Sequence, residues 1–329
     1  MMMRAHRLSG ILAVAPLAAM LALAPFGCDA GARTRPARAA VVAELSDALK
    51  AKRPKDGEWF GLYLLGKKVG YVYVQLELLP GEHLPGSTDK ARSINELYFR
   101  AEVANRVSER RHREVRIYEA KPNGRLLSLV VEQSGDGGTQ TLEATNTAQH
   151  LHIVRKRPGL PDEEKDLPPS PETIEAADQP RVALLRNAPQ EHLITDGTDL
   201  QKYRLTSKVE KGEERLIGGV PVKLQRVVTL SEKENVPAVA LLTSQGETVE
   251  IEMGGAMRVV AEPEEIAKRL DRVEVFALTR VVLPKPLPEV RRQVPGEVKL
   301  VVSGLPESFH QKSARQSYRV LPGGQTEIT

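Results

Sequence analysis

The chain has 329 residues, of which 41% are apolar and 4% aromatic, with 47 Lys and Arg against 43 Asp and Glu. This length suits one large domain or two ordinary ones, and so few aromatic residues leave the core to Leu, Val, Ile and Ala. The near balance of charge argues against a basic surface for nucleic acid, so we expect no nucleic-acid partner. A single cysteine excludes an internal disulfide and a cysteine-based zinc site, and we predict no metal and no cofactor.

The N-terminus has the pattern of an export signal. Two arginines in residues 1–10 precede residues 11–26, ILAVAPLAAMLALAPF, which carry no charge and contain two prolines. A basic segment followed by an apolar one and by small residues is typical of a secretory signal peptide. The apolar run is shorter than the roughly 20 residues that a membrane-spanning helix needs. We therefore predict a signal peptide over residues 1–28.

The signal ends in PFGC, which places Gly27 before Cys28, the only cysteine. This ending resembles the lipobox of bacterial lipoproteins, which implies that Cys28 receives diacylglycerol before cleavage. Several fatty chains on Cys28 would exceed the two-signal threshold for stable membrane anchoring. Phe26 and Pro25 depart from that pattern, and the A-x-A site at residues 30–32 is the alternative, which would release a periplasmic or secreted protein. Both alternatives predict export to the cell envelope.

Residues 29–56 precede the predicted β domain. Residues 29–40, DAGARTRPARAA, are small, basic and proline-containing, which predicts a tether. Residues 39–52 place apolar side chains at positions i, i+3 and i+7, which predicts one short amphipathic helix. The sequence RPKDG then predicts its end.

Residues 57–282 have the alternation of an antiparallel β protein. In residues 69–78, for example, valines and leucines alternate with tyrosine, glutamine and glutamate, which predicts half-buried strands. Hairpin turns are predicted at 66–68, 121–124 and 134–138. We predict a mainly β fold, a large twisted antiparallel sheet that forms a half-barrel or two packed meanders, with a few short helices.

The two meander halves are assigned to residues 57–170 and 171–282. The six prolines of residues 158–180 predict a surface connection. Short helices are predicted over 181–187 and over 263–270, where a proline and two glutamates open the segment.

The sequence pattern changes in the C-terminal part, residues 283–329. Residues 284–297 predict a linker, and residues 298–304 and 316–329 predict strands. These strands are C-terminal strands of this chain or the start of a following domain.

Several of these segments share a pattern with a known family. They are WFGLYLLGKKVGYVYVQLEL, PNGRLLSL, GGVPVKLQRVV, SQGETVEIEMGGAMRVVAEPEEI and ARQSYRV. Over roughly residues 58–325 they resemble the non-catalytic N-terminal region of transglutaminase-like proteins of the bacterial cell envelope. In that family a following papain-like domain supplies a Cys-His-Asp triad. No catalytic residue is assigned here, because Cys28 lies in the signal region. The chain either ends before such a domain or is a stand-alone relative.

Other candidate motifs have ordinary structural interpretations. His150 and His152 share a strand face but lack a third zinc ligand. Residues 109–114, ERRHRE, favour a solvated strand face over a lipid-headgroup site. Residues 134–138, SGDGG, lack the features of a phosphate or calcium loop and favour a turn. A turn is also predicted at residues 196–197.

Two further checks concern catalysis. The sequence contains no G-x-S-x-G nucleophile elbow, and the paired acids Glu264 and Glu265 suit a helix N-terminus. We predict a non-catalytic binding or positioning module in the bacterial envelope, lipid-anchored to the membrane, whose partner is an envelope protein, a peptide or an apolar ligand. The alternatives are the substrate-positioning part of a transglutaminase-like protease or acyltransferase, and a half-barrel carrier of a lipid or another apolar ligand.

Overall fold

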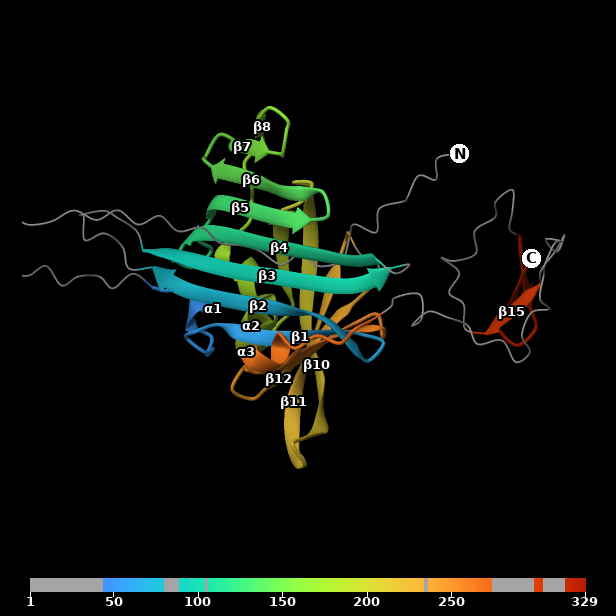
Figure 1. Cartoon of the computed structure of the whole chain (residues 1–329). Helices are drawn as coiled ribbons and strands as arrows, with labels where there is room; N and C mark the ends of the chain where they lie inside the picture. The colour runs from blue at the N-terminus through green and yellow to red at the C-terminus, as the bar shows by residue number, and fades with distance from the viewer. Residues whose placement is uncertain (1–43, 80–88, 104–105, 234–235, 274–298, 304–316) are drawn as a thin grey trace, which may run out of the picture. The chain divides into compact units, whose positions relative to one another are not determined.

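The computed structural model describes residues 44–79, 89–103, 106–233, 236–273, 299–303 and 317–329 (Figure 1). The predicted signal peptide with Cys28, the tether over residues 29–40 and the linker over residues 284–297 lie outside the described residues. The chain forms two compact units, residues 1–279 and 280–329. The prediction of a mainly β fold is confirmed, because one antiparallel sheet of 14 strands dominates the first unit and does not close into a barrel.

The first eight strands form one meander in which each strand pairs with the next. They are β1 (Glu58–Leu64), β2 (Lys67–Leu79), β3 (Lys90–Val103), β4 (Arg106–Glu119), β5 (Leu126–Gly135), β6 (Gly138–Asn146), β7 (Leu151–Lys156) and β8 (Glu163–Leu167). The first hairpin turns at Leu65 and Gly66, whose φ angles are 49° and 80°. Sequence reasoning placed this turn one residue too late, because a left-handed leucine is rarely expected.

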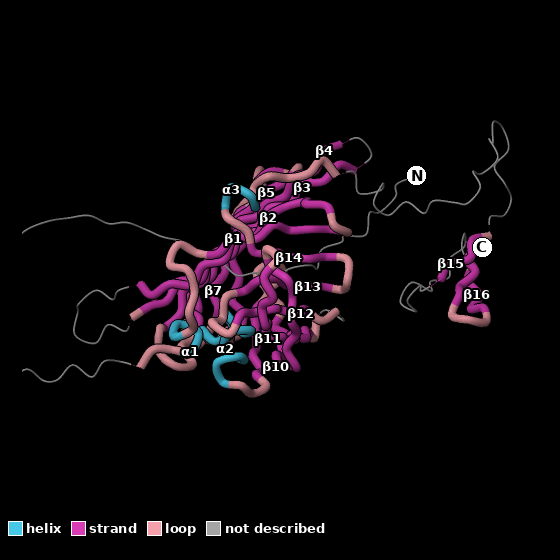
Figure 2. The backbone as a smooth tube through the Cα atoms, turned by 90° about the horizontal axis from the view of Figure 1, so that it is seen from below, coloured by secondary structure: helices cyan, strands magenta, loops and turns pink. Residues whose placement is uncertain are grey.

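The remaining six strands of the first unit form a second meander. They are β9 (Gln190–Thr195), β10 (Lys202–Ile217), β11 (Val220–Ser231), β12 (Ala238–Thr243), β13 (Thr248–Met253) and β14 (Met257–Ala261). Figure 2 shows β14 beside β1, where Leu62 lies opposite Val259 and joins the meanders into one sheet. The two edges of the sheet are therefore β8 and β9.

In the described part of the first unit, four short helical segments accompany the sheet: α1 (Asp47–Lys50), the 3₁₀ helix η1 (Ile174–Asp178), α2 (Gln179–Arg186) and α3 (Glu264–Ala267). Two of them, α2 and α3, lie in the segments where helices are predicted. In the described part of the segment 39–52, however, the helix comprises only Asp47–Lys50, capped by Ser46. A helix of one turn has little stability of its own, and this one is held by Ala48, which is fully buried.

The proline-rich segment 158–180 is more than the predicted surface connection. It contains β8 and η1, and Ile174 and Glu175 in η1 are fully buried. Its prolines lie mostly between these elements. The number of prolines therefore predicts a surface connection although η1 is buried.

The core lies on the inner face of the sheet, where the two meanders approach each other. In Figure 1, β10 and β11 run steeply across the back of β2 to β6. The helix α1 contacts β2 and α2, and α2 contacts β10 and β11, so the helices fill space between the meanders. The first meander contributes a cluster around Tyr118, Leu126, Leu129 and Leu151, which are fully buried.

The second compact unit contains a small antiparallel sheet. Its strands are β15 (Leu300–Ser303), β16 (Tyr318–Leu321) and β17 (Gln325–Ile328), in the order β15-β17-β16. These strands lie where the alternation of the sequence predicts them.

Candidate functional site

Four aromatic side chains lie in contact on the outer face of β1, β2 and β3, and we call them the aromatic row: Trp59, Tyr71, Tyr73 and Tyr98. The ring centroid of Trp59 lies 4.6 Å from that of Tyr73 and 5.6 Å from that of Tyr71. Tyr71 and Tyr98 stack with centroids 5.2 Å apart and ring planes 17° apart. Strand pairing explains the row, because Trp59 lies opposite Tyr73 and Tyr71 lies opposite Tyr98.

The aromatic row is neutral and is bordered by charges. The Tyr71 hydroxyl donates to Glu96 over 3.1 Å, and Arg111 donates to both oxygens of Glu96 over 2.9 and 2.7 Å. Burial, and then the negative charge of Glu96, raises the pKa of Tyr71 to about 12. At the other end, the Lys268 ammonium lies 4.3 Å from the centre of the Trp59 ring, a cation–π geometry.

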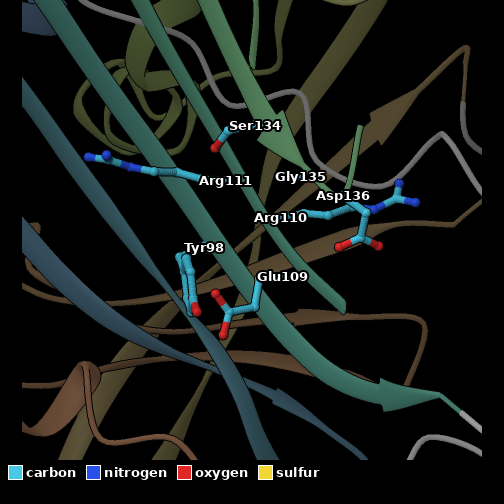
Figure 3. A pocket seen from close by; sticks show the side chains of 7 residues that line it. All are labelled: Tyr98, Glu109, Arg110, Arg111, Ser134, Gly135 and Asp136. Carbon is cyan, nitrogen blue, oxygen red and sulfur yellow. The ribbon is translucent and has the colours of Figure 1, made fainter. Parts of the chain in front are cut away.

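A hollow of about 350 Å³ lies at the Tyr98 end of the row, and we call it the Tyr98 hollow (Figure 3). Its lining comes from β3, β4 and the turn between β5 and β6. The lining residues are Tyr98, Glu109, Arg110, Arg111, Ser134, Gly135 and Asp136. Figure 3 shows the Tyr98 hydroxyl beside the Glu109 carboxylate, and Arg110 beside Asp136.

The groups in the Tyr98 hollow differ in how far they are already engaged. Arg111 is held by Glu96, and Asp136 accepts a hydrogen bond from Ser108 over 3.2 Å. Glu109 lies 3.3 Å from Arg100. Arg110 is exposed but alternates with Arg111 along β4, so its side chain leaves the strand on the side opposite to Tyr98. The hollow therefore offers a ring face and carboxylate acceptors to a ligand.

Two motifs considered in the sequence meet at this hollow. The β5–β6 hairpin turns at Asp136 and Gly137, within the segment 134–138 where a turn is predicted. For the basic segment 109–114, the predicted solvated face holds for only half of the side chains, because alternate residues of a strand point to opposite sides of the sheet. Arg111 lies on the outer face, whereas His112 Nε2 lies 3.0 Å from a Glu114 carboxylate oxygen on the inner side, where Glu114 is 1% exposed.

The other sequence candidates do not form a site. His152 Nδ1 lies 2.8 Å from Asp166 on the exposed β7–β8 ladder. Among the described residues, no group of three His, Cys, Asp or Glu side chains is placed to hold a metal ion. Glu264 and Glu265 begin α3, and a turn follows Asp196, as predicted.

Sequence reasoning missed a buried charged group, which we call the Arg116 cluster: Arg116, Glu114, Glu172, Tyr118 and Thr195. The Arg116 guanidinium forms ion pairs with Glu172 and, over 3.1 Å, with Glu114, and it donates over 2.9 Å to the Thr195 carbonyl. Tyr118 donates to Glu172 over 2.5 Å. Burial, together with the charge of Glu172, raises the pKa of Tyr118 far above its usual value.

The Arg116 cluster joins the meanders rather than offering a site. Arg116 in β4 and Glu172 are each 1% exposed, and Thr195 at the end of β9 is fully buried. The packing is tight here, because a Cβ atom on Gly197 would lie 1.9 Å from a Glu114 oxygen. The alternation of side chains along β4 indicates that Arg116 points to the inner face. No pattern in the sequence, however, predicts that Glu172 is its partner.

Comparison of the chain with family models, with curated proteins and with solved structures found no match. Within the described ranges, none of the helices has the length and apolarity needed to cross a membrane.

Proposed function

We propose that this chain is an exported, lipid-anchored and non-catalytic module that binds an envelope glycan at the aromatic row and the Tyr98 hollow. The observation that carries the proposal is the aromatic row itself, a run of ring contacts from Trp59 through Tyr71 to Tyr98 on the outer face of the sheet. An outer sheet face is ordinarily polar, whereas this one carries four aromatic residues in a chain that has few of them.

The chemistry of the hollow suits a sugar ring. The electron-rich face of an aromatic ring attracts the weakly positive C–H groups of a pyranose, and Tyr98 supplies that face at the end of the row. The carboxylates of Glu109 and Asp136 accept hydrogen bonds from sugar hydroxyls.

Export and anchoring rest on the sequence alone. The support is the basic and apolar N-terminal pattern that ends at Cys28. The non-catalytic role is supported by the position of this only cysteine, since a transglutaminase-like reaction requires a thiolate nucleophile. A catalytic domain elsewhere in a longer protein would make this module its glycan-binding part.

The alternative of a lipid carrier has less support. A half-barrel carrier needs an open apolar pocket on its concave face. In the described part of the first unit, that face is occupied by fully buried side chains such as Tyr118, Leu129 and Ile174.

The test is co-sedimentation of the purified chain with insoluble glycan from bacterial envelopes. We expect the wild-type protein and Tyr98→Phe to sediment, because both keep the ring, and we expect Tyr98→Ala to stay in solution. Arg157→Gln serves as the control for a surface substitution, because Arg157 is exposed on the β7–β8 connection. Sedimentation of Tyr98→Ala at the wild-type level, or none by the wild type, would overturn the proposal.

A further inference from the structure

The edge strand β9 presents backbone groups to which no other strand of the described residues bonds. The Thr195 amide donates to Glu172 over 2.9 Å and its carbonyl accepts from Arg116, so both groups face away from β10. Backbone groups along an antiparallel strand alternate between its two sides. The amides and carbonyls of Glu191 and Leu193 therefore also face away from β10, and no described residue bonds to them.

A hollow of about 290 Å³ borders this edge, and we call it the β9 notch. Its walls include Pro171 and Thr173 on one side and Glu191 and Leu193 on the other. Residues 172 and 174 bond to the start of β5, through the Leu126 amide and the Gly124 carbonyl. The Thr173 amide consequently faces away from β5, so both walls carry backbone donors without a strand partner.

The side chains of the β9 notch leave its edge accessible. Leu193 is 42% exposed and the Glu191 side chain 57% exposed. His192, nine-tenths buried, lines the wall, and its Nε2 atom has no hydrogen-bond partner among the described residues. Burial, and then the charge of Arg186, lowers the pKa of His192 to about 4. The imidazole is therefore neutral near pH 7.

The opposite edge of the same sheet is built differently. The strand β8 has the sequence EEKDL, with its first four side chains exposed. Charged side chains on an edge strand prevent it from pairing with another strand. The strand β9, QEHLIT, has a single residue that is charged at neutral pH, so this edge lacks that protection.

We propose that the β9 notch binds an extended segment of a partner protein, which adds to the sheet as a further strand beside β9. Strand addition of this kind takes its affinity from main-chain hydrogen bonds and its selectivity from alternate side chains. The outward groups of Leu193 and Glu191 supply the hydrogen bonds, about 7 Å apart along the strand. The exposed Leu193 side chain favours an uncharged, β-branched residue in the partner. This site is separate from the Tyr98 hollow and does not depend on glycan binding.

The test is hydrogen exchange by mass spectrometry on the full chain, with the blocked peptide acetyl-Lys-Thr-Val-Thr-Val-Thr-Lys-amide as probe. At saturating peptide we expect amides in fragments that cover residues 188–196 to exchange at least tenfold more slowly. Fragments over β8 should be unchanged. A version of the peptide with alternate N-methylated amides should give no protection. Unchanged exchange at β9, equal slowing at β8, or protection by the methylated peptide would overturn the proposal.

A pair of variants locates the contact. Leu193→Pro removes an outward amide that does not bond to β10, and proline is tolerated on the free side of an edge strand. We expect this variant to lose the peptide-induced protection and Leu193→Thr, which keeps the amide, to retain it. Full protection in Leu193→Pro would contradict the proposal, and the N-methylated peptide tests it in the wild type should Leu193→Pro not fold.

Discussion

Replacing Arg116 by methionine is expected to separate the contributions of the buried and the exposed charges of β4. Arg116 is 1% exposed and pairs with Glu114 and Glu172. Its removal leaves two carboxylates buried without their cation, which costs about 3–5 kcal/mol. For a unit of this size, 1 kcal/mol shifts Tm by about 2–4 °C, so we expect Tm to fall by about 6–20 °C.

Arg111→Met is the matched control, because Arg111 also binds a glutamate through two hydrogen bonds but its side chain is 50% exposed. Glu96 is buried but keeps Tyr71 and, at 3.8 Å, Arg113 as partners when Arg111 is removed, so we expect a cost of about 1 kcal/mol, near the upper end for exposed pairs. Urea denaturation measures both variants, with an unchanged slope m confirming that only stability has changed. Adding Glu172→Gln to Arg116→Met should recover part of the loss. A cost for Arg116→Met within 1 kcal/mol of the Arg111→Met cost would refute the view that this cluster joins the meanders.

Three further predictions concern pH and packing. Burial lowers the pKa of folded His192 to about 4, whereas the unfolded histidine takes up a proton near pH 6.5. The free energy of unfolding should therefore fall by about 3 kcal/mol between pH 6.5 and pH 4. His192→Phe should flatten this part of the curve of unfolding free energy against pH. Burial alone would raise the pKa of Asp196, but hydrogen bonds from Lys233 and two backbone amides outweigh it and lower the pKa. The carboxylate therefore stabilises the fold above about pH 4 and loses this effect as the solution becomes more acidic. Asp196→Asn should be less stable than the wild type at pH 7, and the difference should shrink steadily below pH 4, as measured by urea denaturation. A Cβ atom on Gly70 would lie 2.0 Å from the Tyr98 carbonyl oxygen, whereas one on Gly137 meets nothing within 4 Å. Gly70→Ala should therefore destabilise the fold by about 1–3 kcal/mol, and Gly137→Ala should change its stability by no more than about 0.5 kcal/mol. Equal shifts in Tm for the two variants would contradict the close approach of β2 and β3.

The alternation of single segments was enough to predict most strands and the antiparallel class. In β2, for instance, Val72 and Leu76 are buried while Tyr71 and Tyr73 lie on the other face. Such patterns are local, because successive strand residues point to opposite faces whatever the neighbouring strand is. The pairing of β1 with β14 joins segments about 200 residues apart, and no local pattern specifies it.

The candidate site was predictable only in part for the same reason. The turn over residues 134–138 is predicted from its glycines and lines the Tyr98 hollow. The aromatic row depends on the register that places Trp59 opposite Tyr73 and Tyr71 opposite Tyr98. The Arg116 cluster depends on Glu172, which lies in a proline-rich segment that otherwise indicates only a connection.

Binding at the aromatic row can be measured directly, because Trp59 is the only tryptophan of the chain and belongs to the row. The measurement is a titration of Trp59 fluorescence with soluble fragments of the glycan used for co-sedimentation. We predict a saturable change in the wild type and in Tyr98→Phe, and none in Tyr98→Ala. An unchanged Trp59 signal at saturating glycan, or the same change in Tyr98→Ala, would contradict binding at this face of the sheet.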